Sequence, residues 1–157
     1  MTTIEQATFS DIAELVELRL GYLTDDFGEL TSEQRADIPT ELEPYLRFHL
    51  GRDLRATVAR CDGHIACTAW LLLVDKPPSP RFPHGRTGVL FNVFTRPAYR
   101  RQGLARRVMQ ELLQDARSMG LDVVELHATD DGYALYKSLG FVDDSSTHKP
   151  MRLMLVE

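Results

Sequence analysis

The chain has 157 residues, of which 43% are hydrophobic and 26% are charged, and its formal net charge is −5. These values are typical of one globular domain, which we expect to span residues 1–157. No apolar run approaches the length of a membrane span, and the N-terminal residues lack the basic-then-apolar pattern of a signal peptide. We therefore expect a cytoplasmic protein without a membrane anchor.

The charge is distributed unevenly along the sequence. Between Lys76 and Gln110 every charged residue is Lys or Arg, so this segment is strongly basic while the rest of the chain is acidic. A basic segment indicates either a solvated face or a site for an anion. The acidity of the whole chain argues against a broad nucleic-acid-binding surface. We expect a local anionic ligand and no nucleic acid.

Hydrophobic periodicity and turn residues predict ten elements in the order β-α-α-β-β-β-α-β-α-β. They are a strand over Thr2–Ala7, a helix with an apolar stripe from Ile12 to Leu23, a helical region over Ser32–Arg52, strands over Leu54–Cys61, His64–Val74 and Thr87–Phe94, a helix over Gln102–Met119, a strand over Asp122–His127, a helix over Tyr133–Leu139 and a closing strand over Met151–Val156. Pro39 and Pro44 are expected to split the second helical region or to lie in first turns. The order predicts an α/β fold with a mixed sheet.

The two cysteines flank a predicted hairpin turn. Asp62-Gly63 favours a two-residue turn, which pairs Cys61 with His64 and Cys67 with Val58. Successive cross-strand pairs alternate between the faces of a sheet, so this register places the two thiols on opposite faces. We expect reduced cysteines, without a disulfide or a shared metal site.

The segment from Asn92 to Arg107 carries the clearest functional pattern. An apolar strand ends at Pro97 and is followed by a basic loop with the pattern Arg100-x-x-Gly103-x-Ala105, which leads into the strongest helix. Free N–H groups at a helix N-terminus, surrounded by guanidinium groups, are suited to bind a pyrophosphate. The alternative is a solvated Arg cluster beside an ordinary helix start.

This loop resembles the acyl-CoA pyrophosphate loop of the GNAT superfamily of N-acetyltransferases, and the order of elements is similar to that of the family along the whole chain. The resemblance implies a mixed, centrally splayed sheet flanked by helices, with pantetheine bonded to the backbone of a bulged strand in the gap. The implied acetyl-CoA-binding residues are Val93, Phe94, Thr95, Arg100, Arg101, Gln102, Gly103, Leu104, Ala105, Arg106 and Thr129. An N–H near Val93 or Phe94 is an implied oxyanion donor.

The segment from Thr129 to Phe141 is similar to the Leu-Tyr-x-x-x-Gly-Phe ending of the same family, although many relatives have Asn where this chain has Thr129. Tyr136 falls on the position of the family's general acid, which assists departure of the thiolate. Tyr133, one turn earlier, is a competing candidate, and a core tyrosine is the structural alternative. The spacing to Gly140-Phe141 favours Tyr136.

No residue is a clear general base. Asn92 lies on the strand where some relatives place Glu or His, and it cannot accept a proton, so we expect it to orient substrate or water. Glu125 and His127 alternate onto one face of the next predicted strand, beside the acceptor, where they can act through a water molecule; a structural role is the alternative for His127. Asp26 and Glu29 lie in an acidic segment around Gly28 that we expect to border the acceptor pocket or to form a solvated turn.

We therefore expect an N-acetyltransferase that binds acetyl-CoA and a primary amine of a small molecule or peptide in a ternary complex. We expect no metal. The alternative is a non-catalytic acyl-CoA-binding or regulatory module of the same fold. Dimers are frequent in the family, so a homodimer stays open. The proline-rich loop over residues 77–85 either shapes the acceptor pocket through Phe82 or His84 or is a surface insertion.

Overall fold

The computed structural model describes residues 1–157 and contains one five-stranded sheet in the order β1-β2-β3-β4-β5. The first four strands are antiparallel neighbours, and β5 is parallel to β4. The elements are β1 (Thr2–Gln6), the 3₁₀ turn η1 (Phe9–Asp11), α1 (Ile12–Phe27), α2 (Ser32–His49), β2 (Leu54–Cys61), β3 (His64–Asp75), β4 (Arg86–Thr95), the 3₁₀ turn η2 (Pro97–Tyr99), α3 (Leu104–Ser118), β5 (Val123–Glu125) and α4 (Asp130–Ser138). The expected mixed α/β fold is confirmed.

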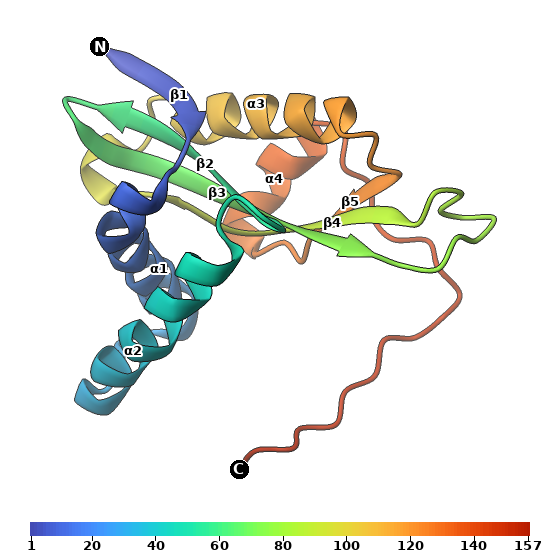
Figure 1. The fold of residues 1–157 in the computed structure, drawn as a ribbon, viewed down its shortest axis with the longest axis horizontal. Helices are drawn as coiled ribbons and strands as arrows, with labels where there is room; N and C mark the ends of the chain where they lie inside the picture. Colours follow the sequence, from blue (N-terminus) through green and yellow to red (C-terminus); the bar gives the residue numbers. More distant parts are fainter.

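The helices cover the two faces of the sheet separately. Figure 1 shows α3 on one side of the strands and the α1–α2 pair on the other. The α1–α2 side packs around Trp70, which is fully buried, and the α3 side packs around Val108, Met109 and Leu112. The predicted apolar stripe of α3 is the face that faces the sheet, because the stripe repeats at helical spacing.

Helix α2 is one continuous helix, so the expected break at Pro39 or Pro44 is wrong. Each proline removes one bond to the carbonyl four residues earlier, on Arg35 and Thr40 respectively. Both of those residues are exposed, and water can hydrate their carbonyls. Burial of the inner face around Leu46 keeps the helix intact.

The two cysteines share one face of the sheet, so the expectation of opposite faces is wrong. Cys61 pairs with His64 as predicted, but a bulge makes Cys67 the partner of Ala59. One extra residue in β3, Ala66, reverses the alternation of side chains beyond it. Both thiols are buried in the α3-side core and are not joined by a disulfide.

A second bulge lies in β4. Trp70 of β3 is opposite Phe91, and Thr68 is opposite Phe94, so Ala69 alone faces two residues, Asn92 and Val93. The extra residue places Phe91 and Asn92 on the same side of the sheet, toward α1. Gly21 of α1 approaches this strand closely, since a Cβ there would lie 2.6 Å from the Phe94 ring.

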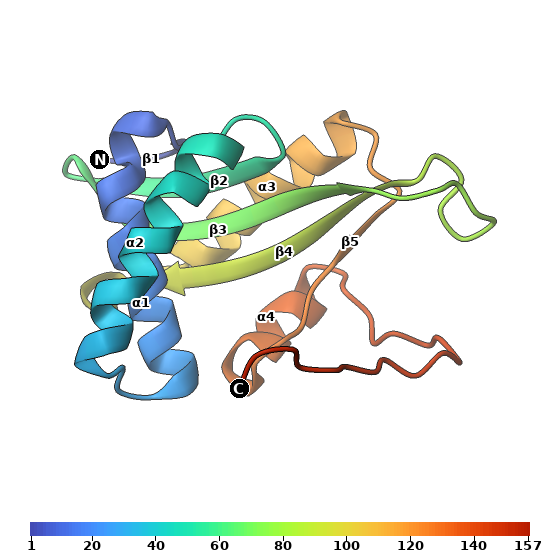
Figure 2. The same ribbon diagram turned by 60° about the horizontal axis from the view of Figure 1, so that its bottom comes forward.

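Strands β4 and β5 separate after a short parallel contact. Only Thr87, Gly88 and Val89 of β4 pair with β5, and the following half of β4 has no partner on that edge. Figure 2 shows β5 turning away from β4 toward α4. The expected splay of the sheet is thus present, and β5 is shorter than the predicted strand over Asp122–His127.

The predicted closing strand over Met151–Val156 is absent. After α4 the chain is extended but forms no ladder with any strand, and its apolar side chains are exposed. Figure 1 shows this segment running away from the body of the molecule. A strand needs a neighbouring backbone to satisfy its N–H and C=O groups, and this segment has no such neighbour within the chain. No helix of the structure combines the length and apolarity required to cross a membrane.

Candidate active site

The basic loop forms a turn at the N-terminus of α3. Gly103 is the N-cap residue with a φ of 76°, and Arg101 is also left-handed, with a φ of 65°. No protein hydrogen bond uses the backbone N–H groups of residues 101–103, and those of residues 104–106 belong to the first helical turn, which has no intrahelical acceptors. These N–H groups and the positive end of the helix dipole therefore form a surface that is suited to bind an anion.

The arginines of this loop divide into two groups. Arg100 donates to the Thr95 carbonyl at 2.9 Å and to the Asp25 carboxylate at 2.8 Å, and Arg106 donates to Ser138 Oγ at 2.7 Å. Arg101 and Arg107 are exposed and form no ion pair. The structure thus uses Arg100 and Arg106 to hold the loop against α1 and α4, and it leaves Arg101 and Arg107 free.

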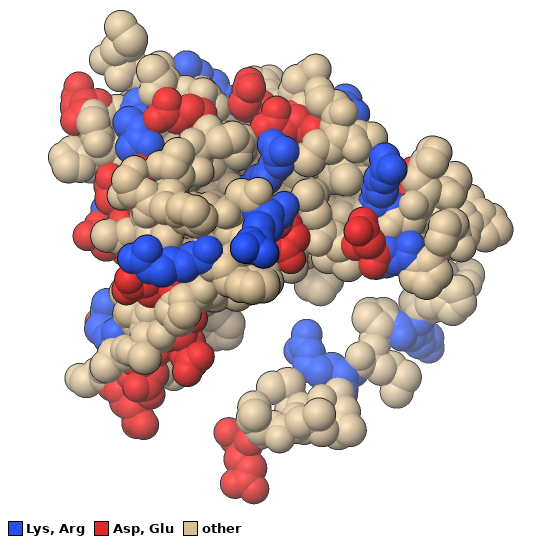
Figure 3. Space-filling view, viewed as in Figure 1, with Lys and Arg blue, Asp and Glu red and all other residues tan.

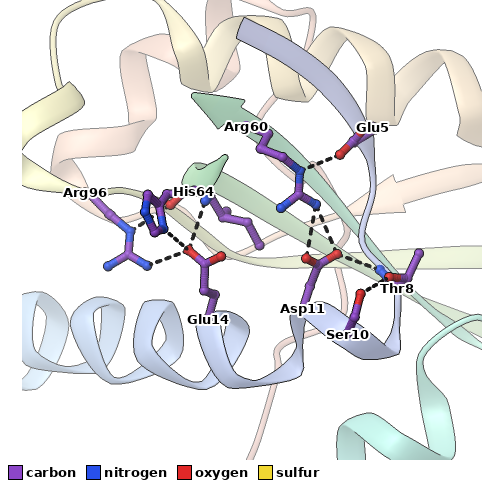
Figure 4. A network of polar contacts seen from close by, with 9 residues as sticks. Glu5, Thr8, Ser10, Asp11, Glu14, Arg60, His64 and Arg96 are labelled. Atoms are coloured by element: carbon purple, nitrogen blue, oxygen red, sulfur yellow. Dashed lines mark hydrogen bonds and ion pairs between the residues drawn. The ribbon is translucent and has the colours of Figure 1, made fainter. Parts of the chain in front are cut away.

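Arg96 anchors the start of the loop. Its Nε donates to the Ile65 carbonyl at 2.7 Å, and its Nη2 donates to Glu14 at 3.2 Å and to Glu17 at 3.1 Å. Figure 4 shows Arg96 and His64 converging on Glu14, beside the separate pairing of Arg60 with Asp11 and Glu5. These contacts border a polar recess of about 420 Å³ and fix the chain where it leaves β4.

The open edge of β4 lies next to this loop. Val93, Phe94 and Thr95 follow the last residue of β4 that pairs with β5, so the groups they direct toward β5 have no partner in the sheet. An extended ligand arm can add to such an edge as a strand does. The residues expected to bind pantetheine therefore lie in the gap.

Asn92 is the most unusual residue of the site. It is 1% exposed, its φ is 52°, and its Nδ2 is a buried polar atom without a hydrogen-bond partner. Its Oδ1 accepts a bond from Arg19 Nη1 at 3.2 Å. Backbone strain together with an unsatisfied buried donor indicates a functional position.

Arg19 of α1 contacts Asn92, and Tyr22 of the same helix lies beside Arg19; neither residue was expected at the site from the sequence. The Arg19 guanidinium lies 5.8 Å from the centre of the Tyr22 ring and 5.9 Å from that of Phe91. The spacing of Leu15, Arg19 and Tyr22 places all three on one helix stripe. A charged residue within an apolar stripe was the signal that was available in the sequence.

The two candidate tyrosines of α4 point to different environments. The Tyr133 hydroxyl donates to the exposed Asp143 carboxylate at 2.7 Å, and this bond raises its pKa. Tyr136 packs against the α3-side core and Phe141, close enough to Tyr22 and Cys67 for their charges to act on it. Burial raises the pKa of Tyr136 to about 12.

The other expected site residues lie at the margins. Thr129 is the N-cap of α4, where its hydroxyl accepts from the Gly132 N–H at 3.3 Å. His127 is exposed beyond the end of β5. Asp26 lies in the last turn of α1 rather than in a loop, and Glu29 is 3.5 Å from Arg35.

Two further expectations concern the β3–β4 loop and Glu125. Glu125 pairs with Lys76 at 3.3 Å, and His84 pairs with Asp122 at 2.7 Å. Both pairs join the β3–β4 loop to residues in or next to β5, toward the end of β4 opposite to Thr95, and Figure 1 shows the loop protruding there. The proline-rich loop is therefore a surface insertion and does not shape the site around Asn92.

Charge on the surface is mixed. In Figure 3 the Lys and Arg side chains alternate with acidic ones over the sheet and α3, and acidic side chains gather at the lower left, over α2. Helix α2 carries Glu33, Asp37, Glu41 and Glu43. No group of three or more His, Cys, Asp or Glu side chains is arranged to hold a metal ion.

Comparisons with known proteins agree with this geometry. The crystal structure of a predicted acetyltransferase with acetyl-CoA from Clostridium acetobutylicum is 28% identical, with a TM-score of 0.84 over 96% of both chains. Glucosamine-6-phosphate N-acetyltransferase from Arabidopsis thaliana is 22% identical, with a TM-score of 0.70 over 96% of this chain and 98% of that chain.

Ribosomal-protein-alanine N-acetyltransferase from Brucella melitensis is 19% identical, with a TM-score of 0.71 over 97% of this chain and all of that chain. The last two similarities concern the fold alone. No curated protein matches the chain. The model of the acetyltransferase (GNAT) family matches residues 14–141, which include the loop, the open edge and Tyr136. The chain therefore belongs to the GNAT acetyltransferase family.

Proposed function

We propose that this protein is an N-acetyltransferase that transfers the acetyl group of acetyl-CoA directly to a primary amine. The observation that carries this proposal is the unpaired edge of β4, which runs from an anion-binding helix start to a strained, buried Asn92. In this assignment the N–H groups of residues 101–106 bind the diphosphate. Val93, Phe94 and Thr95 bind pantetheine.

The order of these groups along the chain sets the direction of the bound coenzyme. The diphosphate lies beyond Thr95, so the pantetheine arm runs back along β4 and its thioester ends near the bulge at Asn92. A backbone N–H of Val93 or Phe94 then faces the thioester carbonyl and stabilises the oxyanion that forms when the amine attacks. Holding both reactants in one geometry supplies much of the rate enhancement.

Tyr136 assists the departure of the thiolate. Its pKa of about 12 keeps the phenol protonated at any physiological pH. A thiol has a pKa of about 8.5, so full proton transfer from this phenol is unfavourable. Its contribution is therefore a hydrogen bond to the developing sulfur anion.

The amine loses its proton without a dedicated base in the protein. Asn92 cannot accept a proton, His127 is exposed, and Glu125 is paired with Lys76 at the far end of β5. The protein therefore uses the neutral fraction of the amine, and the proton leaves through solvent. A covalent acyl-cysteine is not part of this mechanism, because Cys67 is fully buried and burial raises its pKa to about 11.

A homodimer is part of the proposal and involves the C-terminal segment over residues 149–157. Five of its apolar side chains are between 64% and 94% exposed: Met151, Leu153, Met154, Leu155 and Val156. The outer edge of β5 is also unpaired. In the dimer the C-terminal segment of each chain lies along β5 of a second copy and buries both surfaces.

The test of activity is the release of free thiol from acetyl-CoA in the presence of a panel of primary amines. Tyr136→Phe should lower kcat about 10- to 100-fold with little change in KM for acetyl-CoA, since it removes one hydrogen bond made in the transition state. Tyr133→Phe is the matched control on the same helix, because its hydroxyl contacts Asp143 at the surface. Its kcat should match that of the unmodified chain.

A non-catalytic coenzyme-binding module gives a different result. Such a module would show a rise in melting temperature with CoA, as binding to the folded state requires, but no thiol release with any amine. Absence of both effects at millimolar CoA would contradict the assignment of the loop. Equal kcat for the chain with and without the Tyr136 hydroxyl would remove this residue from the mechanism.

A further inference from the structure

We propose that Arg19 and Asn92 bind an anionic oxygen group of the acceptor, so that the substrate is an amine that also carries a carboxylate or a phosphate. This inference rests on the proposed function, because it places the acceptor beside the thioester. It names a specificity-determining pair that holds the part of the acceptor that does not react.

Arg19 is part-buried but, unlike Arg60 and Arg96, has no carboxylate partner. Arg60 is paired with Glu5 and Asp11, and Arg96 is paired with Glu14 and Glu17. Arg19 makes one side-chain hydrogen bond, to the neutral Asn92 amide, although a guanidinium has five N–H donors.

This arrangement is costly without a ligand. Burial lowers the pKa of Arg19, because desolvation disfavours the charged form. Asp26, the nearest carboxylate that acts on it, lies two turns further along α1 and is exposed, and it forms no ion pair with Arg19. A buried charge is normally paired, so the missing anion is assigned to a ligand.

Asn92 adds a second donor at the same place. Its NH₂ group is bonded to the same amide carbon as the Oδ1 that accepts from Arg19, and Nδ2 is the one buried side-chain polar atom in the chain without a hydrogen-bond partner. An anionic oxygen at this position accepts from both the amide and the guanidinium. It would satisfy the charge and the free donor together.

The surrounding side chains hold Arg19 in place and do not neutralise it. The rings of Tyr22 and Phe91 flank the guanidinium, and Tyr45 of α2 is close enough to affect it. Burial raises the pKa of both Tyr22 and Tyr45, so neither phenol supplies a negative charge to Arg19. A site lined by donors and one positive charge recognises oxyanions rather than neutral amines.

The position of the pair also limits the size of the acceptor. Asn92 directly precedes Val93, whose backbone N–H is a proposed oxyanion donor. The anionic group therefore lies one residue from the reacting carbonyl. A compact acceptor fits this geometry, with a few bonds between its amine and its acidic group.

The test compares acceptors with and without an anionic group, using the full chain with acetyl-CoA. Rates are expressed per concentration of neutral amine, because the two members of a pair differ in the pKa of the amine. The pairs are short amino acids and their primary amides, and ethanolamine phosphate and ethanolamine. In either the carboxylate pairs or the phosphate pair, we expect kcat/KM to be at least about tenfold higher for the acid than for its neutral analogue. This ratio corresponds to the loss of one buried hydrogen bond to a charged group. The carboxylate and phosphate arms show which oxyanion the pair selects.

Arg19→Met should reduce the acid-to-neutral ratio by at least about tenfold, whereas Arg19→Lys should keep part of it, since Lys retains the charge but not the fork. Arg47→Met is the control, because Arg47 is exposed on α2 and pairs with Glu43. Its ratio should match that of the unmodified chain. A rise in melting temperature with CoA verifies that each variant folds.

Binding keeps the inference testable if no amine is acetylated. With CoA present, calorimetry on the same acids and neutral analogues should show tighter binding of the acid, and Arg19→Met should lose this difference. Equal binding and equal kcat/KM of acids and neutral analogues in the unmodified chain would overturn the inference. An acid preference that survives in Arg19→Met would also overturn it, while the acetyltransferase assignment would stand.

Discussion

At the scale of single residues, Asn92 connects the strain of the backbone with the chemistry of the site. Its φ of 52° lies in the left-handed region, which Asn enters more readily than most residues. Other residues tolerated there, such as Gly, have no amide to offer. An Asn at this bulge therefore supplies an unusual backbone conformation and a fixed hydrogen-bond donor together.

Asn92→Gly should separate these two contributions. Gly adopts a φ of 52° without strain, but the lost side chain leaves a small buried cavity, so we expect the free energy of unfolding to fall by about 1–2 kcal/mol. The kcat/KM should fall by about tenfold or more, because the amide that orients Arg19 is lost. Thermal unfolding and kinetics on the best acceptor measure the two effects.

Asn92→Val is the contrasting variant. A β-branched residue is strained at this φ, so it should destabilise the fold by about 1–3 kcal/mol. If Asn92→Gly kept full activity, the residue would serve the backbone alone.

The pKa of Tyr136 predicts the shape of the pH profile. A phenol with a pKa of about 12 stays protonated through pH 10, so kcat/KM should rise with pH as the alkylamine, with a pKa of about 10, loses its proton. A tyrosine at its ordinary pKa would instead cause a falling limb near pH 10. Rates measured between pH 7 and pH 11 on an acceptor of known pKa distinguish the two outcomes, because the falling limb would be visible only above pH 10.

At the scale of elements, the N-terminus of α3 illustrates how a loop can be tested without disturbing the fold. Gly103 has a φ of 76°, and a Cβ added there would contact no atom within 4 Å. Gly103→Ala should therefore lower the free energy of unfolding by only about 1 kcal/mol, from backbone strain. The added methyl group projects where the diphosphate is expected.

The expected kinetic result is a rise of about tenfold in KM for acetyl-CoA. Gly51→Ala is the matched control, because Gly51 has a φ of 84° and also has no neighbour within 4 Å of a Cβ. It should show the same loss of stability with an unchanged KM. Equal KM values in both variants would contradict the assignment of the loop to the diphosphate.

Elements with strong local patterns were predictable from the sequence. Strand β2 has the expected bounds of Leu54–Cys61, and α3 lies within the expected range, because alternation and helical spacing are local properties. The bulge at Ala66 was not predictable, since one extra residue reverses the faces without a local signature, and the bulge at Asn92 was expected only from the family resemblance. The first bulge determines the face of the sheet on which Cys67 lies, and the second directs Asn92 toward Arg19.

The part of the candidate site that is formed by residues adjacent in the sequence was predictable. The loop over residues 100–106 and Tyr136 lie in continuous motifs. Arg19 and Tyr22 join the site across the sheet, so their role depends on the packing of α1 against β4. The prediction of a closing strand over Met151–Val156 was wrong for a related reason. An apolar pattern does not show whether its partner strand lies in the same chain or in a second copy.

At the scale of the whole molecule, the exposed C-terminal segment predicts the state of association. The unmodified chain should elute as a dimer at micromolar concentration, and deletion of residues 149–157 should give a monomer that still binds CoA. Size-exclusion chromatography with light scattering measures both. A monomer in the presence of residues 149–157 would contradict the exchange of this segment between two copies.

The short contact between β4 and β5 has a consequence for motion in solution. Helix α4 has no fully buried residue, and three paired residues of β5 precede it in the chain. Amide hydrogens of residues 130–138 should exchange with deuterium faster than those of α3, whose inner face is buried. Coenzyme in the gap would contact Tyr136 and slow that exchange, so deuterium uptake by α4 should report the fraction of molecules that hold acetyl-CoA.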